Sequence, residues 1–495
     1  MLTRRTLLAA AAGLAGGSLV GLPRRARAAW GSWPAAYADL RLAPERRATR
    51  ILEVFVYGGL CPWDTFYCRP SWGEDQERYL YAFGKGALEK RLGDCGLGDG
   101  LSLSLPFAED SAGDLVHLGP WTAPLWSRPD ILSRARVILG QHDQFPHSTA
   151  IPLALTGHRL GRPELAGTAA AISRHFTELE GGDGMPRSCV IHPGDIVRLD
   201  NVHSALAIGE HPSASRPLEL DLKQLPHLLG LLQRPATADH RNAHDSVIDA
   251  YRQAYAGRLQ SPKGAILSAP ELIAWESVDG ARRRAEDLLA WTPPGLFGLG
   301  NGEACGETRA SKPAMAARVA RHLLSQDLGI RYALWIDSGL RPTLDGGHDT
   351  HRDHLIQAAR NYSHTFETLA SVITAPGEND PDKLDLDNTM IAITSEFGRT
   401  PYREDEREGL GHWPGASVSV LLGGPVDSAA VVGRVDPTSG RAAEAASPAE
   451  LRMALLMALG VYPFAPGSFV ASDVRGATDT RTALLRLRSL LSVSD

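Results

Sequence analysis

The chain has 495 residues, of which 43 % are hydrophobic and 22 % charged, and its formal net charge is −6. This length is sufficient to bury a large core, and the composition excludes a disordered, collagen-like or polytopic membrane protein. The first 28 residues hold five arginines and no acidic residue, so the chain without them is more acidic still. This charge balance excludes a general nucleic-acid-binding protein.

The N-terminal segment predicts an export signal. Arg4-Arg5 precedes an apolar run from Leu7 to Val20, and Ala26-Arg27-Ala28 follows it. This is the layout of a signal peptide, and the apolar run is too short to span a bilayer. The paired arginines resemble a twin-arginine signal, with an ordinary secretory signal as the alternative. We therefore expect residues 1–28 to be removed after the twin-arginine translocase exports the protein, which would be periplasmic or secreted without a stable membrane span.

The cysteine count leaves the disulfide pattern open. The chain has five cysteines, at positions 61, 68, 95, 189 and 305. In an oxidising compartment at most two pairs form, and a local bridge among Cys61, Cys68 and Cys95 is one interpretation. The sequence contains no C-x-x-C motif, so a zinc ribbon is excluded.

Strand-like and helix-like segments alternate along the rest of the chain. Short apolar runs predict strands at residues 51–57, 135–140, 188–191, 331–336, 389–394 and 418–422. Apolar residues at three- and four-residue spacing predict helices at 149–156, 242–259, 269–291, 313–328, 351–374 and 448–459. We expect a single α/β domain over 29–495, with a mainly parallel central sheet flanked by helices and a mostly helical insertion or cap at about 194–330. Functional groups should then lie at the carboxyl ends of the strands.

Two polar loops follow the first two predicted strands. Asp64 lies on a glycine-rich turn after the first strand, where it would bind a metal ion or cap a helix. His147 and Ser148 precede a predicted helix, whose free N–H groups and dipole favour an anionic ligand. An ordinary N-cap role for Ser148 is the alternative.

The densest set of potential metal ligands follows the strand at 331–336. Residues 345–354 contain three histidines and three aspartates, Asp349 and His351 among them, around a Gly-Gly turn. Imidazole and carboxylate ligands together suit Zn, Mn or Fe, and fewer imidazoles suit Mg or Ca. A solvated polar loop is the alternative, with His354 on the exposed face of the next helix.

Three further candidates flank the last predicted strands. Glu396 and Arg399 follow the strand at 389–394, and His412 precedes the strand at 418–422. Glu396 would bind a metal ion or act as a base, and Arg399 would hold an oxyanion in its planar fork. A salt bridge between Glu396 and Arg399 is the alternative.

These motifs resemble, over roughly residues 50 to 480, the exported bacterial domain-of-unknown-function family numbered fifteen-hundred-and-one, which is often described as sulfatase-like. The resemblance rests on motifs in this order: Asp64-Thr65-Phe66, His147 with Thr156-Gly157, Gly346 to His351, Ser395 to Thr400, and His412-Trp413. It implies an alkaline phosphatase and sulfatase-like fold, whose members hydrolyse phosphate or sulfate esters at one or two metal ions. It also implies Asp64, Asp349, His351 and His412 as metal ligands.

The chain departs from that superfamily at two places. The superfamily nucleophile is a Ser, Thr or modified Cys ten residues before the glycine of a Thr-Gly pair, and His147 occupies that position here. His147 would form a phosphohistidine or bind metal, or Ser148 would take the role. Glu396-Phe397 stands where the superfamily has an Asp-His ligand pair. A complete two-metal site is therefore in doubt.

The sequence favours an exported metal-dependent hydrolase of sulfate or phosphate esters, acting on a small molecule or a glycan. A divalent ion (Zn, Mn, Fe or Ca) on Asp64, Asp349, His351, Glu396 and His412 would activate water, and Arg399 would stabilise the transferred anion. The alternative is a non-catalytic, degenerate member that acts as a periplasmic binding or assembly protein. A dinucleotide-dependent oxidoreductase is disfavoured, because no G-x-G-x-x-G follows a predicted strand.

Overall fold

The computed structural model describes residues 28–96, 103–159, 166–180, 186–194, 203–207, 217–224, 238–258, 295–326, 328–340, 347–404 and 407–492. The predicted signal segment lies outside the described residues except for Ala28, and so does the helix predicted at 269–291. None of the described helices is both long and apolar enough to cross a membrane.

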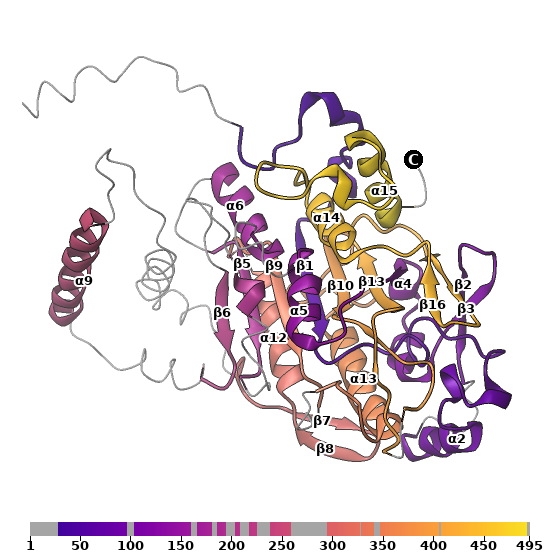
Figure 1. The fold of residues 1–495 in the computed structure, drawn as a ribbon. Coiled ribbons are helices and arrows are strands. Elements are labelled where there is room, and N and C mark those ends of the chain that lie inside the picture. Colours follow the sequence, from indigo (N-terminus) through magenta and orange to yellow (C-terminus); the bar gives the residue numbers. More distant parts are fainter. Residues whose placement is uncertain are drawn as a thin grey trace, which may run out of the picture.

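A central sheet of eight strands organises the molecule (Figure 1). Its strands are β1 (Arg50–Val56), β4 (Ala135–Gly140), β5 (Ser188–His192), β6 (Leu218–Asp221), β9 (Tyr332–Asp337), β10 (Thr389–Ser395), β13 (Ser417–Gly423) and β14 (Ala430–Val432). Their spatial order is β14-β4-β13-β10-β1-β9-β5-β6. All neighbours pair in parallel except β13, which is antiparallel to both β10 and β4. The mainly parallel α/β sheet predicted from the alternation is thus confirmed.

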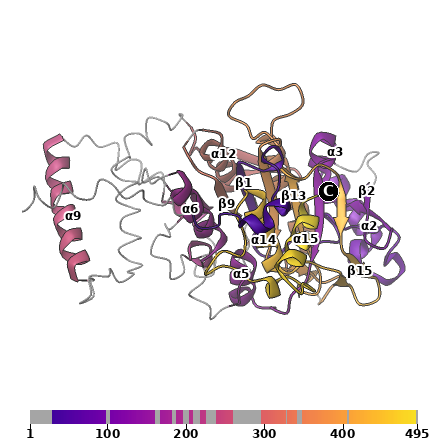
Figure 2. The same ribbon diagram turned by 90° about the horizontal axis from the view of Figure 1, so that it is seen from above.

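Helices cover both faces of this sheet. One face carries α12 (Lys312–Ser325) and α13 (His354–Ser371), and the other carries α5 (His147–Thr156), α6 (Thr168–Glu180), α14 (Pro448–Ala458) and α15 (Thr480–Leu491). Figure 2 shows α12 on one side of the sheet and α5, α14 and α15 on the other. Alternate residues of β1 enter the two cores, Leu52 and Val54 on one face and Ile51 and Phe55 on the other. A strand buried on both faces has no solvent-facing side, which explains why β1 is apolar apart from Arg50 at its start and the ion-paired Glu53.

The remaining described elements are smaller. Helices α2 (Lys85–Asp94), α3 (Ala123–Trp126) and α4 (Pro129–Leu132), and the hairpin of β2 (Leu105–Glu109) and β3 (Leu115–Leu118), precede β4. Helix α9 (Ala238–Arg258) and the hairpin of β7 (Asn301–Ala304) and β8 (Glu307–Ala310) lie within the predicted insertion. Two-stranded pairs join β11 (Gly398–Arg399) to β12 (His412–Trp413), and β15 (Arg434–Asp436) to β16 (Arg441–Ala443). Strand β6 extends the central sheet and α12 covers it, so parts of the segment 194–330 belong to the main layers.

A buried ion pair fastens α14 to the sheet. Glu53 in β1 accepts hydrogen bonds of 2.6 and 2.7 Å from Arg452 in α14, and the hydroxyls of Tyr332 and Thr394 donate to the same carboxylate. Helix α14 itself begins with a capping box, in which Ser447 and Glu450 satisfy each other's backbone N–H groups.

The disulfide differs from the local bridge considered above. Cys95, directly after α2, is bonded to Cys305 in the turn between β7 and β8, whereas Cys61, Cys68 and Cys189 are buried free thiols. The backbone of Cys68 pairs with His117 through two hydrogen bonds of 2.9 Å, and the Cys61 thiol lies against Asp64. A bridge among Cys61, Cys68 and Cys95 is therefore wrong, because Cys95 is bonded to Cys305 and both Cys61 and Cys68 are free thiols.

Candidate functional site

The predicted polar loops meet at one edge of the central sheet. Strands β1, β4, β9 and β10 end at this edge, and the antiparallel strand β13 begins there. His412 precedes β13 in the chain, and this reversal of direction brings it to the loops that follow the other strands. The structure thus gathers His147, Asp349, Glu396, Arg399 and His412.

His147 is the first residue of α5 and bridges two carboxylates. Its Nδ1 lies 3.0 Å from Glu396 Oε1, and its Nε2 lies 3.0 Å from Asp349 Oδ2. The ring of Tyr57 stacks on it. Burial lowers the pKa of His147, but the hydrogen bonds to Asp349 and Glu396 outweigh burial and raise the pKa to about 9. The imidazole therefore shares a proton with each carboxylate at neutral pH.

Asp349 also forms an ion pair with Arg399. Burial raises the pKa of Asp349, but the Arg399 charge and the hydrogen bond from His147 hold it well below its usual range. The fully buried Arg399 donates from Nη1 to the carbonyl of Leu410 at 2.9 Å, and from Nη2 to the carbonyls of Gly58 and His348. Its guanidinium is thus engaged in holding Asp349 and the surrounding loops, which differs from the predicted role as a clamp on substrate.

His412 and His351 complete this first cluster. Their Nε2 atoms are 2.9 Å apart, and each lies near Asp349 Oδ1, at 3.3 Å for His412 and 3.2 Å for His351. Burial lowers the pKa of both, that of His351 to about 4 with help from the Arg399 charge, so both rings are neutral at pH 7. The Phe145 carbonyl lies 2.9 Å from His412 Nδ1 and only accepts, which assigns the proton to Nδ1 and a lone pair to Nε2.

Glu396 lies behind His147. Its Oε1 accepts a 2.7 Å hydrogen bond from the backbone N–H of Gly58 in addition to the bond with His147. Phe397 stacks on His412, with ring centroids 4.2 Å apart. The predicted salt bridge between Glu396 and Arg399 is replaced by these separate partners, and Glu396 orients the histidine that faces Asp349.

Asp64 belongs to a different, second cluster. Its Oδ2 lies 2.9 Å from His354 Nε2 and accepts a 3.1 Å hydrogen bond from the Trp121 indole. Cys61 lies in the same cluster. His354 is buried at the start of α13, so the interpretation that placed it on an exposed helix face is wrong. Sequence reasoning missed Cys61 and His354 as partners of Asp64, although Cys61 stands three residues before it.

His348 and Ser148 occupy neither cluster. His348 Nε2 lies 3.0 Å from Asp337 Oδ2 at the end of β9, and its ring stacks on Tyr362, which fixes the turn before Asp349. Ser148 is exposed one residue into α5. The predicted cluster member Asp345 lies outside the described residues.

A cavity of about 590 Å³ lies beside the first cluster. His142 lines it and connects it to the cluster, because His142 Nε2 lies 2.6 Å from the Glu396 carbonyl. Three arginines also line the cavity, Arg159, Arg441 and Arg475, and Arg159 is paired with the exposed Asp143. Asp143 and Asp473 line the cavity as well, so three arginines face two aspartates there, and the excess of guanidinium groups suits an anionic ligand.

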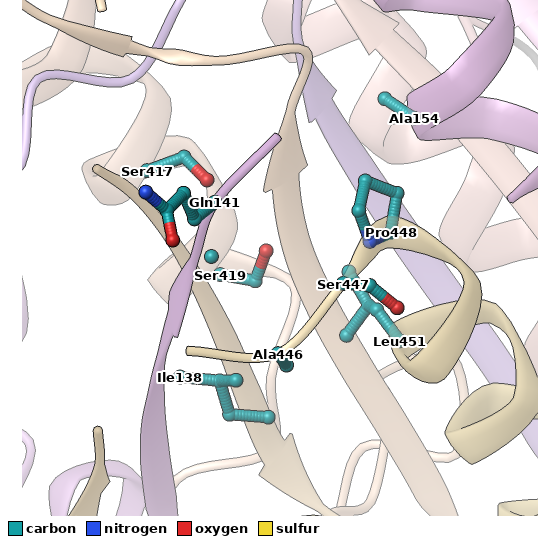
Figure 3. Close-up of a pocket in the computed structure, with 10 residues that line it drawn as sticks. Ile138, Gln141, Ala154, Ser417, Ser419, Ala446, Ser447, Pro448 and Leu451 are labelled. Carbon is teal, nitrogen blue, oxygen red and sulfur yellow. The ribbon is translucent and has the colours of Figure 1, made fainter. Parts of the chain in front are cut away.

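A second, smaller pocket is unsuited to chemistry. It has about 30 Å³ of space between β4, β13 and the start of α14, with Ser417, Ser419 and Ser447 in its wall (Figure 3). None of the described residues that line it has an ionisable side chain. It has room for about one water molecule.

The comparison with known families agrees with the motif resemblance. Residues 343–465 match the family model described as "Protein of unknown function (DUF1501)". The matched segment includes Asp349, His351, Glu396, Arg399 and His412, but not Asp64 or His147. No curated protein matches the chain.

Proposed function

We propose that this protein is an exported metal-dependent hydrolase of sulfate or phosphate esters, with its ion held by His147, Asp349 and His412. One observation carries this proposal: a ligand atom of each of these residues lies within 4.8 Å of the other two, at the edge where the strand-end loops meet. Two imidazoles and one carboxylate favour Zn, Mn or Fe over Ca.

The surroundings of these three side chains fit a metal ion. The Phe145 carbonyl accepts from His412 Nδ1 and leaves the Nε2 lone pair facing Asp349. Glu396 accepts from His147 Nδ1 and leaves Nε2 directed at the same aspartate. Metal-binding histidines generally have such an oxygen partner on the other ring nitrogen. An ion in this place would replace the proton between His147 and Asp349.

Each residue of the site would have a separate role in hydrolysis. A divalent ion at this site would polarise the ester and lower the pKa of a bound water molecule. His351 has a side chain that is 37 % exposed and is neutral at pH 7, so it would offer a hydrogen bond to the attacking water. Arg159, Arg441 and Arg475 would bind the anionic group in the neighbouring cavity. Arg399 would orient Asp349.

One observation favours a second candidate, a non-catalytic binding protein. His147 stands at the position of the superfamily nucleophile, and both of its ring nitrogens are already hydrogen-bonded to carboxylates. A covalent intermediate on His147 would break one of these bonds. In this candidate the same site would hold an ion or an anionic glycan without turnover.

Metal content and hydrolysis together test the proposal. Metal would be measured by plasma mass spectrometry on the signal-processed protein and on an Asp349→Ala, His412→Ala double variant. The control is His117→Ala, which removes a histidine of β3 that contacts Ser104. We expect about one equivalent of a transition metal to be lost in the double variant only, and hydrolysis of aryl sulfates or phosphates to be lost with it. Metal binding without hydrolysis would favour the binding protein, and equal metal in all three would overturn the hydrolase and any metal-binding role of this site.

Export by the twin-arginine route is part of the proposal. It rests on Arg4-Arg5, the following apolar run and the Ala26-Arg27-Ala28 end. We expect Arg4→Lys together with Arg5→Lys to retain the precursor in the cytoplasm. Fractionation with antibody detection would show this, and normal export of the variant would instead favour the ordinary secretory route.

A further inference from the structure

The second cluster is built from two of the loops that also contribute contacts to the first. Cys61, Asp64 and His354 each offer a ligand atom, and these atoms all lie within 4.8 Å of one another. All three side chains are buried. The first two come from the loop after β1, and His354 begins α13.

One atom of this cluster lacks a partner. Asp64 Oδ2 is bonded to His354 and Trp121, but the buried Oδ1 has no hydrogen-bond partner among the described residues. A buried carboxylate oxygen without a donor costs free energy that a bound cation would recover. This oxygen is therefore available to bind a cation.

We infer that Cys61, Asp64 and His354 hold a second metal ion, separate from the ion of the proposed active site. A thiolate, a carboxylate and an imidazole together select a borderline or soft divalent ion, of which Zn²⁺ is the best match. The Cys61 thiol loses its proton to solvent as the ion binds. Thr350 Oγ1 lies 2.6 Å from His354 Nδ1 and accepts from Nδ1–H in the bound form, which leaves Nε2 free to ligate.

This ion would hold the loop after β1 against the loop after β9, both of which contact or contribute to the first cluster. In the loop after β1, Gly58 bonds to Glu396 and Arg399, and Cys61 and Asp64 follow it. In the loop after β9, Asp349 belongs to the first cluster and His354 to the second. The second ion is thus structural, and its existence does not depend on hydrolase activity at the first site.

Cobalt substitution of the mature full-length protein tests this inference. Co²⁺ bound by a thiolate has an intense near-ultraviolet charge-transfer absorption, and the first cluster contains no cysteine. We expect this band in the wild type and in His412→Ala, and its loss in Cys61→Ser. The matched control is Cys68→Ser, which removes another buried free thiol of the same loop and should keep the band. A wild type that binds Co²⁺ without the band, or a band lost only in Cys68→Ser, would overturn the inference.

A measurement without variants covers the case in which Cys61→Ser fails to fold. X-ray absorption at the zinc edge of the Zn²⁺-loaded wild type should show a sulfur neighbour at about 2.3 Å. Spectra fitted by nitrogen and oxygen neighbours alone would overturn the second site. That result would leave the first site untouched, since its ligands are nitrogen and oxygen atoms.

Discussion

Glu53 and Asp349 are both buried carboxylates paired with arginine, but their surroundings are organised in opposite ways. Glu53 lies in the middle of the sheet, and its two oxygens receive donors from Arg452, Tyr332 and Thr394. Every neighbour is a donor and both charges are fully buried. Asp349 lies at the edge of the sheet, where the side chain of one of its histidine neighbours is 37 % exposed.

The difference lies in the balance of donors and acceptors. Around Asp349, three imidazoles approach one carboxylate, and the Nε2 of His412 presents a lone pair to it. A buried carboxylate whose oxygens are all satisfied by protein donors, such as Glu53, stabilises the fold. A carboxylate that faces a histidine lone pair, such as Asp349, favours a cation between them. Burial alone does not separate these two cases, because both carboxylates are buried.

The largest effect on stability is expected at the Glu53–Arg452 ion pair. Glu53→Ala leaves the guanidinium of Arg452 buried without a counter-charge, which should lower the free energy of unfolding by about 3–5 kcal/mol. Urea unfolding followed by circular dichroism measures this loss. The matched control replaces both partners with methionine and should recover most of the stability, because it buries no charge. A loss below about 1 kcal/mol in Glu53→Ala would contradict the comparison.

A smaller effect on folding, but a large one on metal binding, is expected at the edge. The half-buried His412 lies at the surface of the first cluster, so His412→Ala should change the unfolding free energy of the metal-free protein by no more than about 1 kcal/mol. It removes a proposed ligand, and the affinity for Zn²⁺ should fall by more than about 100-fold. Isothermal titration calorimetry measures the affinity. Unchanged Zn²⁺ affinity with strongly reduced stability would place His412 in the same structural class as Arg452.

Glu396, which orients His147, should have a smaller effect on Zn²⁺ affinity than His412. Glu396→Gln keeps the size of the side chain but weakens its hold on His147 Nδ1, so the Zn²⁺ affinity should fall by about 10- to 100-fold. The same titration measures it, and His117→Ala, which removes a histidine that contacts Ser104 and not Glu396, is the control. A loss larger than that of His412→Ala would mean that Glu396 binds the ion directly.

The sequence was sufficient to predict the sheet, and the reason is visible in the strands. Strands β1 and β10 are buried on both faces, so each is a mainly apolar run whose ends lie within one residue of the predicted ones. Strand β6 was not predicted, because its sequence Leu218–Asp221 is short and half polar. The Cys95–Cys305 bridge joins residues separated by 210 positions, and no local pattern encodes such a pairing.

The sequence predicted where the candidate site lies, but not that its residues form two separate clusters. Strand-end placement brought Asp349, Glu396 and His412 together, because the carboxyl ends of parallel strands share one edge. Placement at a strand end does not show which of these side chains contact one another. The sequence analysis therefore assigned Asp64 to the same ion, although Asp64 pairs with His354. The antiparallel direction of β13, which explains the position of His412, was also not encoded in any local pattern.

The smallest expected effect is the change with pH in the stability that the Glu53–Arg452 ion pair contributes. Burial raises the pKa of Glu53, but the charge and hydrogen bonds of Arg452 outweigh burial and lower it below its ordinary value. A lowered folded-state pKa stabilises the protein above the unfolded-state pKa of about 4.3, and this contribution is lost as pH falls toward the folded-state pKa. The isosteric variant Glu53→Gln lacks this titration. The difference in unfolding free energy between wild type and Glu53→Gln should therefore be constant from pH 7 to about 5 and shrink below that, by at most about 1.4 kcal/mol per pH unit. Urea unfolding at several pH values measures it, and a difference that stays constant into the acid range would show that folding does not lower the pKa of Glu53, which would contradict the ion pair with Arg452 as a source of stability.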